Sequence, residues 1–144
     1  MSASPSTALE TLLSNIERVA GGGEEPLVVF DLDGTLYDNT HRTLRIMLEF
    51  AHTHALTQRA LFDRLRSIAP RDLLYRVGDT LAAIGLADPE LATVLTDFWK
   101  ARFFTDDYCL YDLPIAGAVE LVNRVHKAGG VPCYLTGRDA PNML

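Results

Sequence analysis

The spacing of apolar residues changes several times along the chain and divides it into helical and strand-forming stretches. Residues 27–30 form an uninterrupted apolar run, and residues 131–135 form a second one. Apolar runs of this length without alternation are typical of strands buried on both faces of a parallel sheet. The stretch before the second run is amphipathic with helical spacing and stops at Gly129 and Gly130. This order predicts a strand, a crossover helix and a second, parallel strand.

Residues 1–25 are expected to form a helix followed by a linker. Thr7 and Glu10 have the spacing of a capping box. Helical spacing then relates Leu9, Leu12, Leu13, Ile16 and Ala20. Three consecutive glycines at residues 21–23 end the helical pattern just before the first strand.

The middle of the chain, residues 39–105, has helical periodicity throughout. It is expected to hold four amphipathic stretches, and Asp88 followed by Pro89 predicts the start of the last one. Short connections favour antiparallel neighbours, so this region predicts a small helical bundle. The apolar positions of the four stretches are Leu44, Met47, Leu48, Ala51 and Ala55; Leu61, Leu65 and Ile68; Leu73, Leu74, Val77, Leu81 and Ile84; and Leu91, Val94, Leu95 and Phe98. The bundle interrupts an α/β core expected over residues 26–38 and 106–144.

Two carboxylates, Asp31 and Asp33, follow the first apolar run directly. If the strand geometry persists, they project to the same side at the carboxyl end of the strand, where open α/β sheets bind ligands. Two carboxylates held close together repel each other, so a cation or a shared proton is expected between them. A calcium-binding loop is a poor alternative, because Arg42 stands where the closing glutamate belongs. An acidic turn without chemistry is the other alternative.

Composition excludes several classes of function. The net charge of −6 over 144 residues gives no electrostatic reason to expect nucleic acid, and no apolar run approaches the length that spans a membrane. Two cysteines are too few for a disulfide framework, and the first residues do not resemble a signal peptide. The expected location is the cytoplasm, with neither a nucleic acid nor a membrane as partner.

Two motifs resemble those of the haloacid dehalogenase-like superfamily. Residues 31–35, Asp-Leu-Asp-Gly-Thr, resemble its first motif, and residues 133–138, Cys-Tyr-Leu-Thr-Gly-Arg, resemble its second. The resemblance implies a Rossmann-like parallel sheet with a helical cap inserted after the first motif. It also implies a phosphatase that works through a phosphoaspartyl intermediate on a small phosphorylated substrate.

The resemblance implies a role for each carboxylate of the first motif. Asp31 would attack phosphorus, and Asp33 would protonate the leaving oxygen and later activate water. Mg²⁺ would bind the Asp31 carboxylate and the backbone carbonyl of Asp33, so both residues are expected metal ligands.

Other residues of the two motifs are expected to bind phosphate. Gly34 would permit a tight turn, Thr35 would brace it, and Thr136 and Gly137 would offer a hydroxyl and an amide to a phosphate oxygen. Arg138 is expected either to reach the substrate or to pair with Asp139. Arg42 is a further candidate for binding an anionic substrate, with an exposed surface position as the alternative.

The chain ends eight residues after Thr136, before the lysine and the acidic pair that the resembled family places further on. We therefore expect an N-terminal piece of a longer enzyme, with the C-terminal half of the core or a self-associating sheet edge as partner. The functional alternatives are a non-catalytic fragment that binds phosphate or metal, a phosphotransferase and a dehalogenase. Asp33 argues against the dehalogenase, because that branch does not normally carry an acid there.

Overall fold

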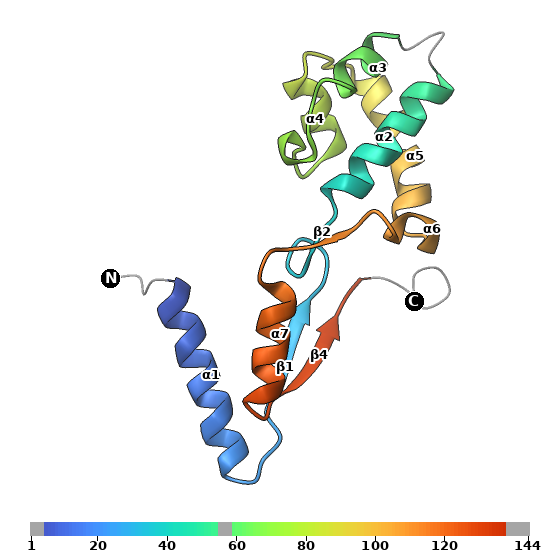
Figure 1. The fold of residues 1–144 in the computed structure, drawn as a ribbon. Coiled ribbons are helices and arrows are strands. Elements are labelled where there is room, and N and C mark those ends of the chain that lie inside the picture. Colours follow the sequence, from blue (N-terminus) through green and yellow to red (C-terminus); the bar gives the residue numbers. More distant parts are fainter. Residues whose placement is uncertain (1–4, 55–58, 138–144) are drawn as a thin grey trace. The chain divides into compact units, whose positions relative to one another are not determined.

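The computed structural model describes residues 5–54 and 59–137. Helices and a short parallel sheet together confirm the expected α/β fold class (Figure 1). The chain divides into two compact units. The described part of unit 1 comprises residues 5–38 and 114–137, and the described part of unit 2 lies within Asn39–Leu113.

Unit 1 is built on two parallel strands, β1 (Leu27–Asp31) and β4 (Val131–Leu135). Helix α7 (Ala118–Lys127) precedes β4, and helix α1 (Pro5–Gly21) precedes β1. The register of the ladder runs from the pair Leu27 and Val131 to the pair Asp31 and Leu135. The predicted helix and parallel strands are therefore confirmed, although α1 begins before the expected cap residue Thr7.

One face of this sheet packs on the helices of unit 1. Phe30 is buried on that face, and the rest of the buried cluster consists of Leu13, Ile16, Leu36, Ala118 and Val125. Gly130 lies close to α7 and α1, since a Cβ atom there would stand 2.9 Å from Val125 Cγ1 and 3.1 Å from Ile16 Cγ2. The glycine pair that ends α7 thus also allows the close approach of α1.

The expectation that both strands are buried on both faces is wrong for the described residues. Leu27 is 68% exposed, Val29 is 61% exposed and Leu135 is 66% exposed. In β1, Leu27 and Val29 alternate with Val28 and Phe30, which belong to the cluster packed on the helices. An apolar run in the sequence indicates that a strand can be buried on both faces. Burial also needs other elements that pack on each face, and the run does not reveal whether they are present.

A second sheet of two short strands, β2 (Tyr37–Asp38) and β3 (Leu113–Pro114), was not expected from the sequence. Each strand is only two residues long, and neither has an apolar run or a period-2 pattern. Such short ladders depend on a partner distant in the chain, which local sequence does not reveal.

Unit 2 is helical, as the periodicity predicts. In chain order its elements are α2 (Thr40–Thr53), α3 (Arg59–Leu65), the 3₁₀ helix η1 (Pro70–Asp72), α4 (Val77–Ala83), α5 (Pro89–Phe103) and α6 (Asp106–Cys109). Its core holds Met47, Phe50, Ala51, Leu61, Leu65, Val77, Leu81, Leu91 and Leu95. Most of these were predicted apolar positions, and Phe50 was not.

In unit 2, the start of α5 agrees with the sequence prediction, whereas the start of α4 does not. Asp88 caps α5, and its carboxylate accepts hydrogen bonds from the amides of Glu90 at 2.9 Å and Leu91 at 3.2 Å. In contrast, α4 begins at Val77 rather than near Leu73. The buried Thr80 hydroxyl accepts a hydrogen bond from the Leu74 amide at 3.0 Å, which holds that segment outside the helix.

Candidate functional site

Asp31 is the last residue of β1, and it stands opposite Leu135, the last residue of β4. Thr136 follows directly, so the first carboxylate and the threonine of the second motif lie at the same edge of the parallel sheet. The Asp31 side chain is exposed, and Thr136 is half-buried. This is the edge at which α/β sheets bind ligands, and the pairing brings together two motifs about a hundred residues apart.

The loop after Asp31 is a tight turn around the carbonyl oxygen of Leu32. That oxygen accepts hydrogen bonds from the amides of Thr35 at 3.3 Å, Leu36 at 3.0 Å and Tyr37 at 2.9 Å. Gly34 has a φ of +78°, a left-handed conformation that residues with a Cβ atom adopt only with strain. The sequence prediction that Gly34 permits a tight turn is consistent with this conformation.

Thr35 contacts the expected nucleophile directly. Its hydroxyl donates a hydrogen bond to Oδ2 of Asp31 over 2.8 Å. Since both side chains are exposed to solvent, the bond orients the carboxylate without burying it. Of the two carboxylate oxygens, Oδ2 is the one that accepts this bond.

The two predicted phosphate ligands of the first motif use their backbone amides inside the turn. The Gly34 amide donates to the carbonyl of Tyr37 at 2.8 Å, and the Thr35 amide donates to that of Leu32. In this conformation Gly34 and Thr35 shape the loop, and their binding of phosphate stays a prediction. Gly137 is exposed at the end of β4, and Arg138 lies outside the described residues.

Arg42 is not a surface residue, and this corrects the expectation from the sequence. Its side chain is 0% exposed and lies within unit 2. Nε donates to Oδ1 of Asp112 at 2.7 Å, and Nη1 donates to the carbonyl oxygen of Phe103 at 2.7 Å. A guanidinium that is buried and bound to protein oxygens in this way does not offer its donors to a substrate.

The expected metal site rests on the two carboxylates of the first motif. No group of three histidine, cysteine, aspartate or glutamate side chains converges among residues 5–54 and 59–137. Mg²⁺ commonly takes only one or two protein carboxylates and completes its shell with water and substrate phosphate. Asp31 is exposed at the sheet edge and Asp33 is half-buried, and both carry carboxylate oxygens of the type that hard cations prefer.

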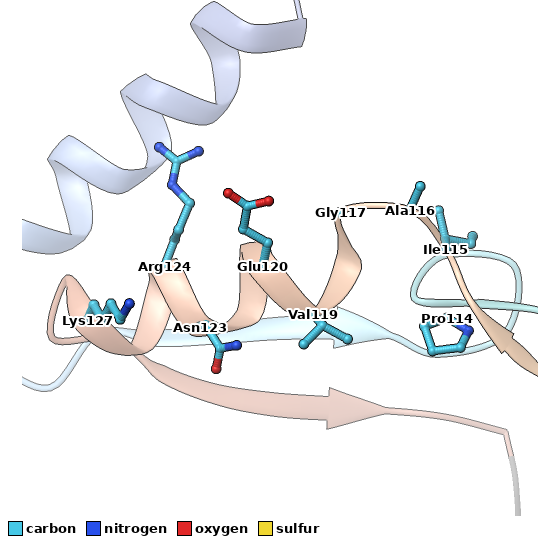
Figure 2. Close-up of a pocket in the computed structure, with 9 residues that line it drawn as sticks. All are labelled: Pro114, Ile115, Ala116, Gly117, Val119, Glu120, Asn123, Arg124 and Lys127. Carbon is cyan, nitrogen blue, oxygen red and sulfur yellow. The ribbon is translucent and has the colours of Figure 1, made fainter.

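A groove of unit 1 lies elsewhere, along α7 and the segment before it (Figure 2). This groove, about 620 Å³ in volume, is lined by residues between Pro114 and Lys127. Glu120 and Arg124 project from one side of the helix, where Arg124 pairs with Glu10 of α1 at 2.8 Å. None of the described residues that the motifs single out lines it.

A polar network inside unit 2 was missed by the sequence analysis. Glu49 accepts hydrogen bonds from the Tyr108 hydroxyl at 2.5 Å and from Arg102 Nε at 3.0 Å. The bond from Tyr108 lowers the pKa of Glu49, and burial followed by the bond to Glu49 raises the pKa of Tyr108. Glu49 lies more than fifty positions from both of its partners, so no local pattern could have predicted the network.

Comparison with known proteins agrees with the two motifs. A family model described as haloacid dehalogenase-like hydrolase matches residues 26–143. No curated protein and no solved structure matches the chain. The matched range contains the strand edge with Asp31 and Thr136, and it also contains the described part of unit 2. In the part of the chain that the structure describes, no helix has the length and apolarity needed to traverse a bilayer.

Proposed function

The chain belongs to the haloacid dehalogenase-like hydrolase family, and from this membership we propose that it hydrolyses small phosphomonoesters through an aspartyl-phosphate intermediate. The observation that carries the proposal is the position of Asp31. Its carboxylate ends β1 beside the end of β4, is open to solvent and is oriented by the Thr35 hydroxyl at 2.8 Å. A nucleophile needs this access and this fixed orientation.

In the proposed first step, a carboxylate oxygen of Asp31 attacks the phosphorus atom of the monoester. A bond forms between that oxygen and phosphorus, and the bond from phosphorus to the ester oxygen breaks. Because Thr35 binds Oδ2, the oxygen Oδ1 is the candidate nucleophile. The hydrogen bond from Thr35 would fix the carboxylate plane during the attack.

Asp33 is proposed as the acid and base of the cycle. As an acid it would give a proton to the departing alkoxide, and as a base it would take a proton from the water that hydrolyses the acyl phosphate. The backbone of Asp33 pairs with that of Tyr37 in an isolated β-bridge across the turn. This pairing holds the Asp33 backbone close to the end of β1. Thr136 and Gly137 are proposed to bind a phosphate oxygen from the neighbouring strand end.

Mg²⁺ is the proposed cofactor, held by the Asp31 carboxylate and by Asp33. When bound, the ion would neutralise charge on the phosphoryl oxygens, which a protein of net charge −6 would otherwise repel at long range. The two oxygen ligands suit a hard cation that keeps several waters.

The role of unit 2, the partner and the cellular location are also proposals. Unit 2 would act as a cap that excludes water and selects the substrate. A partner would be the C-terminal half of the core or a second sheet edge, and the location would be the cytoplasm. A fragment that binds phosphate or metal without turnover is the main alternative function; phosphotransfer and dehalogenation are the others.

The test is Mg²⁺-dependent hydrolysis of an aryl phosphate by the 144-residue chain and by its Asp31→Asn variant. We expect turnover that depends on added Mg²⁺ and falls to the rate of buffer in Asp31→Asn. Borohydride reduction during turnover should trap the acyl phosphate and convert Asp31 to homoserine, which mass spectrometry detects as a mass change in the peptide that contains residue 31.

The matched control is Asp63→Asn, the same chemical change at an exposed carboxylate of α3. It should leave the hydrolysis rate unchanged. Equal loss in both variants would contradict a role for Asp31 in the chemistry. No turnover by the wild-type chain at saturating Mg²⁺ would favour the non-catalytic fragment.

A further inference from the structure

The buried Arg42 forms a three-point contact inside unit 2. Its Nε and Nη2 atoms bind the two carboxylate oxygens of Asp112, and its Nη1 atom binds the carbonyl of Phe103 at 2.7 Å. The guanidinium also lies over the Phe103 ring, with Cζ 4.2 Å from its centroid. Both charged side chains are nearly free of solvent, at 0% and 4% exposure.

The positions of the three residues in the chain make this contact unusual. Arg42 stands in the first turn of α2, which begins at Thr40, and unit 2 itself begins at Asn39. Asp112 is the next-to-last residue of unit 2 before Leu113. Phe103 is the last residue of α5. The ion pair therefore joins the two ends of a segment of about seventy residues.

A buried pair of this kind is sensitive to the loss of either partner. The free-energy cost of removing two charges from water is offset only when the two groups contact each other with good hydrogen-bond geometry. Removing one partner leaves the other charge buried and uncompensated. The forked contact of guanidinium and carboxylate also fixes their relative orientation, which a single contact from lysine would not do.

We propose that the ion pair of Arg42 and Asp112 forms a clasp, a contact that holds the two ends of the described part of unit 2 together. The clasp ties the start of α2, the end of α5 and the segment leaving α6 at one point. Its role is conformational, and it is independent of the proposed hydrolysis.

Amide hydrogen exchange of the full chain, followed by mass spectrometry, tests the clasp without any assay of activity. In Asp112→Asn we expect exchange in peptides covering residues 43–46 and 111–113, whose ends hold hydrogen-bonded amides, to accelerate roughly a hundredfold or more, since breaking a buried pair is strongly destabilising. Peptides covering α4 (Val77–Ala83) should change less than about threefold, because opening of the ends is local.

Two further variants keep the test decisive. Arg42→Lys retains the positive charge and loses the two-point contact with the Asp112 carboxylate. It should accelerate exchange at the same two ends by a smaller factor than Asp112→Asn does. Asp63→Asn makes the same change as Asp112→Asn in the exposed Arg59–Asp63 pair of α3, and it should leave both ends unchanged.

The clasp would be overturned by either of two results. One is unchanged exchange at both ends in Asp112→Asn and Arg42→Lys. The other is acceleration of equal size throughout unit 2, which would make the ion pair an ordinary contact of the core. If Asp112→Asn does not fold, the same two readings apply to Arg42→Lys alone.

Discussion

The hydroxyl of Thr35 donates a hydrogen bond to Oδ2 of Asp31 at 2.8 Å. Donor and acceptor are four positions apart in the chain, and the turn between them is closed by hydrogen bonds to the Leu32 carbonyl. The side chain of Thr35, directly after Gly34, therefore binds the carboxylate of Asp31, which precedes the turn. In the proposed reaction, this contact selects the oxygen that faces the substrate.

Replacing Thr35 with valine should lower hydrolysis without unfolding the chain. Valine has a similar shape but no hydroxyl, so Asp31 loses one hydrogen bond, worth about 1 kcal/mol and hence several-fold in kcat/KM. The free energy of unfolding should change by less than about 0.5 kcal/mol, because Thr35 is exposed. Steady-state kinetics with an aryl phosphate measures the first effect.

Serine at position 35 is the control, since it keeps the hydroxyl and should retain most of the activity. An equal loss of kcat/KM in Thr35→Ser and Thr35→Val would show that the methyl group, and not the hydrogen bond to Asp31, matters.

The left-handed conformation of Gly34 predicts strain in an alanine variant. Gly34→Ala should lower the free energy of unfolding by about 1–2 kcal/mol, because a Cβ atom disfavours its φ of +78°. Gly21→Ala is the matched control. Neither position has an atom within 4 Å of the added Cβ, and Gly21 lies in helix α1 without a positive φ. Urea unfolding followed by circular dichroism should separate the two, and equal stability would refute the strain.

Two neighbouring residues of α5 should differ sharply when shortened to alanine. Leu95 is 0% exposed in the core of unit 2, and its loss should cost about 2–5 kcal/mol of unfolding free energy. Val94 is 50% exposed, and its change should stay within about 0.5 kcal/mol. Fluorescence of Trp99, which stacks on Phe103 with centroids 4.4 Å apart, reports unfolding of unit 2. Similar costs at both positions would contradict the packing of α5.

The Glu49–Tyr108 bond predicts how stability depends on pH. The pKa of Glu49 lies below its ordinary value of 4.5 in the folded chain, chiefly because Tyr108 donates to it. Its contribution to stability is therefore present above pH 4.5 and is lost as the pH falls through the lowered pKa. The pKa of Tyr108 lies above its ordinary value of 10.0, chiefly through burial. Its contribution is present below pH 10 and is lost as the pH rises through the raised pKa.

Tyr108→Phe should flatten both limbs of this profile, because it removes the phenol and the bond that lowers the pKa of Glu49. Urea midpoints from Trp99 fluorescence between pH 3 and pH 11 measure the effect. Tyr75→Phe is the control at a fully exposed tyrosine. A profile of Tyr108→Phe that overlays the wild type would rule out the coupling.

Several features of the fold could be predicted because their causes are local. The Asp88-Pro89 cap starts α5 where expected, since the aspartate binds amides two and three residues ahead. Gly34 takes the turn conformation that its lack of a Cβ atom allows. The strand–helix–strand order predicted the parallel pairing of β1 and β4, which brings Asp31 beside the end of β4.

Other features depend on contacts between distant residues and were missed. Arg42 was expected at the surface and is buried, because Asp112 and the Phe103 carbonyl compensate its charge from sixty to seventy positions away. Helix α4 begins at Val77 and not near Leu73 as expected, because the Thr80 hydroxyl accepts a hydrogen bond from the Leu74 amide. Val29 was expected to be buried and is exposed on the uncovered face of the sheet.

By itself, the sequence determined the elements, the order of the two strands and the residues of the two motifs, because propensity, periodicity and turn chemistry act over a few residues. The tertiary structure alone decided which oxygen of Asp31 receives the Thr35 bond, which face of β1 is covered and which acid neutralises Arg42. These outcomes depend on where the chain brings distant groups together, and burial of charge or apolar surface is decided only at that point.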